Sequence, residues 1–276
     1  MPDLTFEQAL AEAGPDGVNV VARSPAFAAE WEPEFLRLAS AFGRPPAGEY
    51  LPTCVFARPL ARGRVAVVQV AAEGQPPVLR FHCLAVSADL YAAVGDPFLI
   101  AERFAPPWGE RIVLPTLSWM DDVPARTVGQ VQRILQEDDG PTLLGSAQAL
   151  VDGGRVVFER PFPAPDLLRR LWMLLPQSTR TEVWPASYAF GPELDVQAVV
   201  VPKADPAKFP GYLTEPQAGD YPEGKYELNL QIAAEAGDQV ALSRLLSRRT
   251  SRQTVWLAVV LIIATMGLAA LTRFLG

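Results

Sequence analysis

The sequence predicts an α+β protein: a soluble head with a mixed, mostly antiparallel sheet and helices, followed by one C-terminal transmembrane helix. Three runs of β-branched or aromatic residues between positions 51 and 86 are separated by short turns, which favours an antiparallel meander. Stretches with helical periodicity alternate with short strands in the rest of the head. Residues 253–272 carry no charge and, at about 1.5 Å per residue, match a hydrocarbon core about 30 Å thick.

The first half of the head, residues 1–110, is the most strand-like part of the chain. Its meander consists of the runs LPTCVFARPL, RVAVVQVA and VLRFHCLAV, which are separated by Arg-Gly and Gly-Gln-Pro-Pro turns. The other elements expected here, in chain order, are an amphipathic helix over 5–13 capped by Thr5, a strand over 18–22, a helix from Pro33 to Phe42, and helical stretches over 87–94 and 97–104. The loop around APPWGE marks the boundary near residue 110.

The second half, residues 111–222, alternates between helical and strand patterns. The expected elements are a helix over 125–137, a segment over 142–151 that fits either helix or strand, a strand over 155–159, a helix over 166–175 ended by Pro176, the strands EVWPASYAF and VQAVVVP, and a Pro/Gly-rich connection over 203–222. Pro185 places the first of these two strands at an edge or a bulge. A juxtamembrane helical region over 223–252 follows, with Gly237 as a candidate break.

Charge divides the chain sharply. The net charge is −7 overall, but all 31 acidic residues precede Gln239, so residues 1–243 carry −12 and the last 33 residues carry +5. Nucleic-acid binding requires clustered Lys and Arg, so an acidic head argues against a nucleic-acid partner. The chain has only three lysines against 21 arginines, a usage that suggests a GC-rich bacterial genome.

The uncharged run 253–272 is interpreted as a transmembrane helix followed by a four-residue tail, 273–276. Gln253 and Thr272 lie at its two ends, and Trp256 suits a membrane interface. Thr265, Gly267 and Ala269 are small enough to let two such helices approach closely, which makes a homodimer a candidate.

The basic residues beside this run predict its orientation. Four arginines precede it and only Arg273 follows it, so the positive-inside rule places the head in the cytoplasm and the protein in a bacterial inner membrane. The four are Arg244, Arg248, Arg249 and Arg252. The start, MPDLTFEQALAEAG, lacks a positive region and a long apolar run, so it is not expected to be a signal peptide. A reducing cytoplasm argues against a disulfide between Cys54 and Cys83.

The composition excludes several kinds of enzyme. One histidine and two cysteines are too few for a zinc site of the usual Cys/His kind. The sequence lacks G-x-x-x-x-G-K-[ST], G-x-G-x-x-G, C-x-x-C and H-E-x-x-H, which argues against P-loop, Rossmann and zincin chemistry. No cofactor is expected. Adjacent loop acids are usually solvated, so no metal site is assigned to Asp121, Asp122, Asp138 or Asp139.

The candidate catalytic residues are Cys54 and His82. If the strands LPTCVFARPL and VLRFHCLAV pair, the two side chains could face each other, and the imidazole could stabilise a thiolate nucleophile. Cys83 would point to the other side of its strand. The alternative is that both cysteines are small buried residues and that His82 is hydrogen-bonded within the sheet.

Two charged stretches are candidate binding regions. Residues 44–80 are locally basic, and Arg58, Arg62, Arg64 and Arg80 near strand ends could grip a phosphate or carboxylate. The alternative is that they pair with acidic residues of the head. Residues 215–238 contain six acids and only Lys225, which suggests either a partner-binding helix or a surface that keeps the head off anionic lipid.

Short segments resemble a known family. R-G-R-V-A-V-V and R-F-H-C-L-A-V within residues 52–86, together with LLPQSTRTEVWPASYAF at 174–190, are similar to the N-terminal domain of bacterial GTPase-associated proteins. The segment DYPEGKYELNLQIAAEAGDQ, followed by a span, resembles tail-anchored proteins of planctomycete-type bacteria. The resemblance implies that the partner is a GTPase or an effector. It also implies that His82 and Arg180 match positions that recur in the family, but it implies no enzymatic activity for them. This chain departs from the family in its short length and its terminal membrane helix.

The sequence therefore predicts a tail-anchored, cytoplasm-facing, non-enzymatic interaction or regulatory module. A membrane-tethered cysteine hydrolase that uses Cys54 and His82 is the second hypothesis. A sensor that binds an anionic ligand through Arg58, Arg62 and Arg64 is the third.

Overall fold

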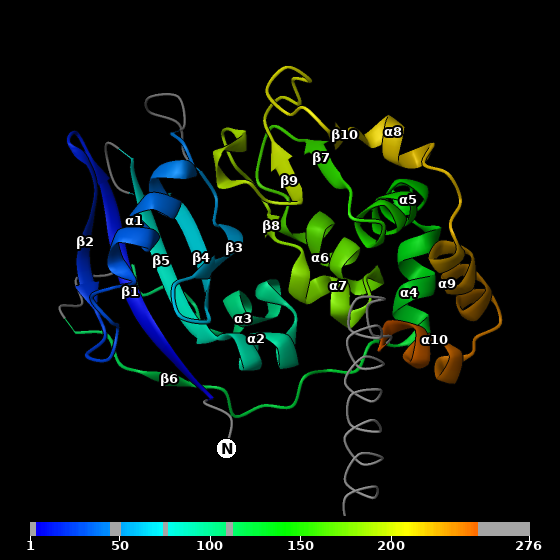
Figure 1. The fold of residues 1–276 in the computed structure, drawn as a ribbon, viewed down its shortest axis with the longest axis horizontal. Helices are drawn as coiled ribbons and strands as arrows, with labels where there is room; N and C mark the ends of the chain where they lie inside the picture. Colours follow the sequence, from blue (N-terminus) through cyan, green and yellow to red (C-terminus); the bar gives the residue numbers. More distant parts are fainter. Residues whose placement is uncertain (1–3, 45–50, 74–76, 109–112, 248–276) are drawn as a thin grey trace, which may run out of the picture.

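The computed structural model describes residues 4–44, 51–73, 77–108 and 113–247. Its centre is one continuous sheet of 10 strands in the order β10-β7-β9-β8-β3-β4-β5-β1-β2, with β6 paired to β1 (Figure 1). The strands are β1 (Thr5–Gly14), β2 (Gly17–Arg23), β3 (Cys54–Leu60), β4 (Arg64–Glu73), β5 (Val78–Ser87), β6 (Leu117–Ser118), β7 (Arg155–Glu159), β8 (Pro185–Ala186), β9 (Ala198–Val201) and β10 (Tyr212–Leu213).

The β-rich half contains the expected antiparallel meander. β3 pairs with β4 and β4 with β5, while β5 continues through β1 to β2, all antiparallel. The prediction of a helix over 5–13 is wrong, because this segment is the strand β1 between β5 and β2. The spacing of Phe6, Ala9 and Leu10 fits a helix, but every residue from Phe6 to Ala11 is buried. Burial on both faces of a sheet removes the alternation that identifies a strand.

Helices cover both faces of this part of the sheet. α1 (Glu32–Ala41) lies over one face, where Phe42 stacks on Phe56 of β3 and meets the ring of Phe81 edge-on. α2 (Ala88–Val94) and α3 (Pro97–Arg103) cover the other face, where Gln69 of β4 donates to the carbonyl of Ala101 at 2.6 Å. The predicted helices over 33–42, 87–94 and 97–104 are confirmed.

The other half adds parallel strands and most of the helices. β7 pairs with β9 and β10, and β8 with β9, all parallel, so the sheet is mixed and mostly antiparallel as predicted. The helices are α4 (Val128–Gln136), α5 (Gly140–Val151), α6 (Pro165–Leu174), α7 (Gln177–Glu182), α8 (Glu215–Gly219), α9 (Lys225–Glu235) and α10 (Gln239–Leu246). Residues 142–151, left open between helix and strand, lie in α5. The predicted strand over 155–159 is β7.

Two segments of this half differ from expectation. EVWPASYAF forms only the two-residue strand β8, while the preceding residues form α7. The connection over 203–222 contains β10 and α8. The break at Gly237 is confirmed: Gly237 has φ +66° between α9 and α10, and Asp238 caps α10 by accepting from the amides of Val240 and Ala241.

The sheet joins the two halves of the head. Phe56 of β3 pairs with Ala186 of β8, and the amide of Val55 donates to Ser187 Oγ at 2.7 Å. One hydrophobic cluster also extends from β1 to α10. The division at residue 110 stays a prediction, and both sheet and core continue across it.

The predicted membrane helix lies outside the described residues, as do Arg248, Arg249, Arg252 and the candidate dimer residues. Within the described ranges no helix is long and apolar enough to span a bilayer. Arg244 lies in the last turn of α10.

Candidate functional site

The structure does not bring Cys54 and His82 together. The strand pairing that the hydrolase hypothesis requires is not formed, because β4 lies between β3 and β5. Cys54 is opposite Val70, whereas His82 is opposite Gln69. Directly opposed residues share a face, so the thiol and the imidazole point to opposite faces of the sheet.

Both thiols lie in an environment that disfavours the thiolate. Cys83 is opposite Val68 of β4 and so shares the face of Cys54. Cys54 and Cys83 are fully buried, and burial raises the pKa of each thiol. The observed surroundings match the alternative of small buried residues and give the hydrolase hypothesis no support.

His82 belongs to a buried hydrogen-bond network. Its Nε2 lies 2.8 Å from Oε1 of Gln8, and its Nδ1 lies 3.5 Å from Oε1 of Gln69. The amide nitrogens of the two glutamines donate to loop carbonyls, Gln8 to Pro115 at 2.5 Å and Gln69 to Phe104 at 2.9 Å. Burial lowers the pKa of His82 to about 4. A neutral imidazole has a single N–H, which donates from Nε2 to Gln8 and joins β5 to β1, whereas the longer contact of Nδ1 with Gln69 Oε1 is not a second donated hydrogen bond.

The four arginines of the basic stretch have separate intramolecular partners. Arg58 donates to the Asp195 carbonyl at 2.6 Å, and Arg62 pairs with Glu30 at 2.8 Å. The guanidinium of Arg64 lies 5.3 Å from the centroid of the Trp31 ring. Arg80 pairs with Glu12 at 3.0 Å. This matches the alternative of paired surface residues, and a ligand site built from these four stays a prediction.

A second group of arginines converges where the two halves of the head meet. Arg180 of α7 is 4% exposed and donates to Asp96 Oδ2 at 2.7 Å. Asp96 precedes α3, and its Oδ1 accepts from the amides of Phe98 and Leu99 at 3.0 Å. Arg126, just before α4, donates to the carbonyls of Met173 and Leu175 at the end of α6.

These side chains line a cavity of about 130 Å³, which we call the arginine pocket. Its polar lining residues are Asp96, Glu102, Arg126, Gln130, Arg169 and Arg180. Burial, with a smaller contribution from the nearby Arg180 charge, lowers the pKa of Arg126 to about 10. Burial also lowers the pKa of Arg180, against the effect of Asp96. The residues that line the pocket come from both halves of the head, and ligand sites often lie between two such parts of a protein.

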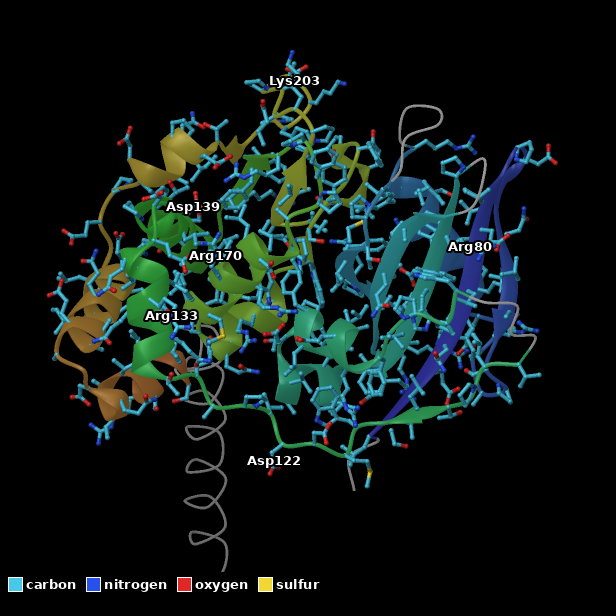
Figure 2. All side chains as sticks on the ribbon, turned by 180° about the vertical axis from the view of Figure 1, so that it is seen from behind. Arg80, Asp122, Arg133, Asp139, Arg170 and Lys203 are labelled. Carbon is cyan, nitrogen blue, oxygen red and sulfur yellow. The ribbon has the colours of Figure 1, made fainter. Side chains whose placement is uncertain are left out.

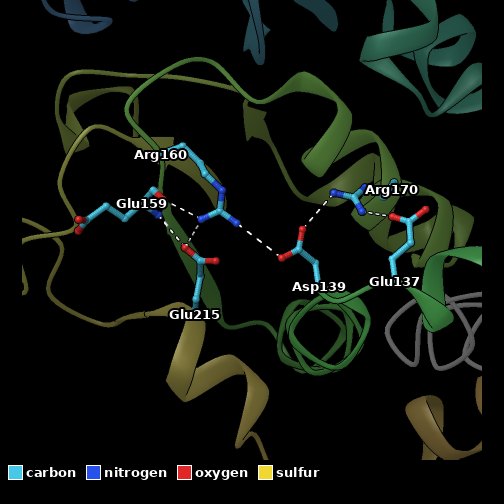
Figure 3. A network of polar contacts seen from close by, with 6 residues as sticks. All are labelled: Glu137, Asp139, Glu159, Arg160, Arg170 and Glu215. Carbon is cyan, nitrogen blue, oxygen red and sulfur yellow. Dashed lines mark hydrogen bonds and ion pairs between the residues drawn. The ribbon is translucent and has the colours of Figure 1, made fainter.

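A third charged group connects the helices to the sheet edge (Figure 3). Arg170 of α6 contacts both Glu137 and Asp139, the latter at 3.1 Å. Arg160, after β7, lies 3.8 Å from Asp139 and 2.6 Å from Glu215 of α8. Opposite charges alternate along this chain of contacts, so its evident role is to hold α5, α6, α8 and β7 together.

The acidic loop residues do not gather into a metal site. Asp121 pairs with Arg103 at 2.5 Å, and Asp139 pairs with Arg170. Asp122 and Asp139 lie far apart, on the β6–α4 connection and on the helical side (Figure 2). Among the described residues no three Cys, His, Asp or Glu side chains are close enough to hold a metal ion.

The acidic stretch 215–238 spreads over α8, α9 and the start of α10. Glu215 pairs with Arg160 and Asp238 caps α10, so these two have structural roles. On α9 the side chains of Leu228 and Ile232, one turn apart, are 45% and 54% exposed. Glu235 continues the same face, since residues i, i+4 and i+7 align on a helix. We call Leu228, Ile232 and Glu235 the α9 surface.

A groove of about 500 Å³ borders the α9 surface. Glu227, Gln231 and Glu235 of α9 form one wall, and Leu135 of α4 and Leu144 of α5 form part of the other. Burial raises the pKa of Glu227.

Sequence reasoning identified Arg180 only through the family resemblance and missed Arg126 and Asp96. Asp96 had one readable signal: an Asp before Pro97 at a helix start is a typical N-cap. Compared with known proteins, the chain matches neither a family model nor a curated protein.

Proposed function

We propose that this protein is a tail-anchored, non-enzymatic interaction module of the bacterial inner membrane, with its head in the cytoplasm. The observation that carries the proposal is the α9 surface, where two large apolar side chains are exposed within an acidic segment. A solvent-facing apolar pair beside a groove is what a partner helix or loop requires.

The charge of this segment indicates the chemistry of the partner. Residues 215–238 contain six acids and one lysine, so a basic segment with apolar side chains would be attracted and a strongly acidic one repelled. The groove beside α9, with a volume of about 500 Å³, is large enough to accept apolar side chains of such a segment. The family resemblance adds a GTPase or effector as the class of partner to test.

The C-terminal sequence supports the membrane location. α10 ends at Leu246 and the uncharged run begins at Gln253, so six residues separate them. Six residues span at most about 20 Å, which would keep the head close to the bilayer. A partner on α9 would then be recruited at the membrane.

The proposal is tested by affinity capture of the full-length protein from gently solubilised membranes. We expect a basic partner to be retained by the wild-type protein and lost from a Leu228→Gln/Ile232→Gln variant, because both apolar contacts are removed. The matched control is Val21→Gln, since Val21 on β2 is 54% exposed, as Ile232 is. Identical sets of captured proteins for wild type and both variants would rule out the α9 surface, and empty captures throughout would argue against an interaction module.

A further inference from the structure

The arginine pocket contains more positive charge than its own residues neutralise. Arg180 and Asp96 form one buried ion pair. Arg126 contacts two backbone carbonyls, and among the described residues no carboxylate pairs with it. Arg169 and Glu102, which pair with each other at 3.1 Å, are 40% and 61% exposed and so belong to the mouth of the pocket. The inner part therefore has one cation in excess.

The Arg180 guanidinium, which lines the pocket, also has an unused hydrogen-bond donor. Arg180 donates through its two terminal nitrogens, to Asp96 and to Gln177 Oε1 at 3.3 Å. Its buried Nε finds no hydrogen-bond partner in the part of the chain that the structure describes. A buried donor without an acceptor costs about 1–3 kcal/mol, and an ordered water or a bound anion next to it would remove that cost.

We propose that the arginine pocket binds a small oxyanion with one negative charge, either a carboxylate or a monovalent phosphate. The oxyanion would neutralise Arg126 and accept hydrogen bonds from the guanidinium groups of Arg126 and Arg180. Arginine suits this role because its planar fork matches two oxygens of such an anion. This site is separate from the α9 surface and does not depend on a membrane anchor.

The size of the cavity limits the ligand. A volume of about 130 Å³ corresponds to about four water molecules at ~30 Å³ each. Pockets for drug-sized ligands measure about 300–1,000 Å³, so a nucleotide or a sugar phosphate is too large to enter whole. The ligand is therefore a free small acid, inorganic phosphate, or the anionic end of a larger molecule that extends past Arg169 and Glu102.

A bound anion would connect the two halves of the head. Asp96 and Glu102 come from α3 and the turn before it, whereas Arg126, Arg169 and Arg180 come from the second half. An anion held between them would tighten the α3–α7 contact that the Asp96–Arg180 pair already makes. The pocket is therefore suited to sense an anionic metabolite.

The test is thermal unfolding of the full-length protein in detergent with acetate or phosphate added, while chloride keeps the ionic strength constant. We expect a saturable rise in Tm with at least one of the two anions. Arg126→Gln should weaken the apparent affinity at least tenfold. Arg133→Gln is the matched control, because Arg133 is an exposed arginine on neighbouring α4 (Figure 2). The anion that gives the larger shift identifies the ligand class.

A second measurement uses the wild-type protein and so does not depend on the folding of any variant. Phenylglyoxal modification of wild-type Arg126, read by mass spectrometry, should slow when the stabilising anion is added, while Arg133 should react at an unchanged rate. The proposal is overturned if neither anion gives a saturable shift beyond chloride, if Arg126→Gln responds like the wild type, or if the anion leaves Arg126 modification unaffected.

Discussion

At the scale of single residues, burial determines the chemistry of His82. Its imidazole is fully buried between Gln8 and Gln69, and burial lowers its pKa from the usual 6.5 to about 4. The folded protein therefore keeps this side chain neutral over a pH range in which the unfolded chain protonates it. The unfolded state then binds more protons, so stability rises with pH in that range.

This shift predicts a specific loss of stability in mild acid. The contribution of His82 should be fully present above about pH 6.5 and should be lost as the pH falls towards 4, by up to about 3 kcal/mol at 1.36 kcal/mol per pKa unit. Denaturant unfolding of wild type and His82→Gln at pH 7, 6, 5 and 4 measures it. The variant should lose less stability than the wild type between pH 6.5 and 4, since the acidic side chains are common to both proteins. Parallel pH profiles would contradict a neutral buried imidazole.

At the scale of elements, the packing of α5 against α8 depends on one small residue. Gly145 lies within α5 and is buried, and a Cβ at this position would be 1.9 Å from the carbonyl oxygen of Ala218 in α8. Moving the backbone of Ala218 out of the way costs more free energy than moving the end of a flexible side chain would. The absence of a side chain at Gly145 is therefore a condition for α8 to lie across α5.

We expect Gly145→Ala to destabilise the protein by about 1–3 kcal/mol, the usual cost of overpacking. Gly129→Ala at the start of α4 is the matched control, because a Cβ there meets no atom within 4 Å and replacing an unstrained Gly with Ala stabilises by roughly 0.4–1 kcal/mol through the unfolded state. Thermal unfolding of both variants should give Tm shifts of opposite sign. Equal shifts would show that α8 moves aside without cost.

The elements also show how far local pattern predicts structure. The meander over β3–β5 and the helices α1, α4 and α6 are predicted by their patterns, because each has one buried and one exposed face or clear turn residues at its ends. The strand β1 is not predicted by its pattern. Phe6 to Ala11 are all buried, and the local sequence does not reveal the elements from other parts of the chain that bury them. α7 is missed because Gln177–Glu182 has no apolar periodicity and is short.

At the scale of the whole molecule, the head contains one continuous sheet, and most of its helices belong to the second half of the chain. The proposed anchor would hold this head near a membrane. The pairing of β3 with β8 joins segments about 130 residues apart, through the hydrogen bonds between Val55 and Ser187. This joint brings α7 against α2 and lets Arg169 of α6 pair with Glu102 and Arg180 of α7 with Asp96, which creates the arginine pocket between them.

The proposed anchoring predicts a clear difference in fractionation. The full-length protein should sediment with membranes and resist extraction by carbonate, whereas a version ending at Arg249 should remain in the supernatant, because the 20-residue uncharged run is removed. Immunoblotting of both fractions measures the outcome. Recovery of the full-length protein in the supernatant would contradict the anchor, and sedimentation of both versions would point to binding through the head.

The sequence by itself determined the class of the fold, the order of most elements, the distribution of charge and the uncharged C-terminal run. These properties depend on the composition of a segment and the spacing of its own residues. Only the tertiary structure decided that β4 separates Cys54 from His82, that the arginines of 44–80 have separate partners, and that Asp96, Arg126 and Arg180 meet. Strand order and the packing of α2 and Asp96 against α7 depend on contacts between residues far apart in the chain, and no local pattern encodes which distant segment becomes a neighbour.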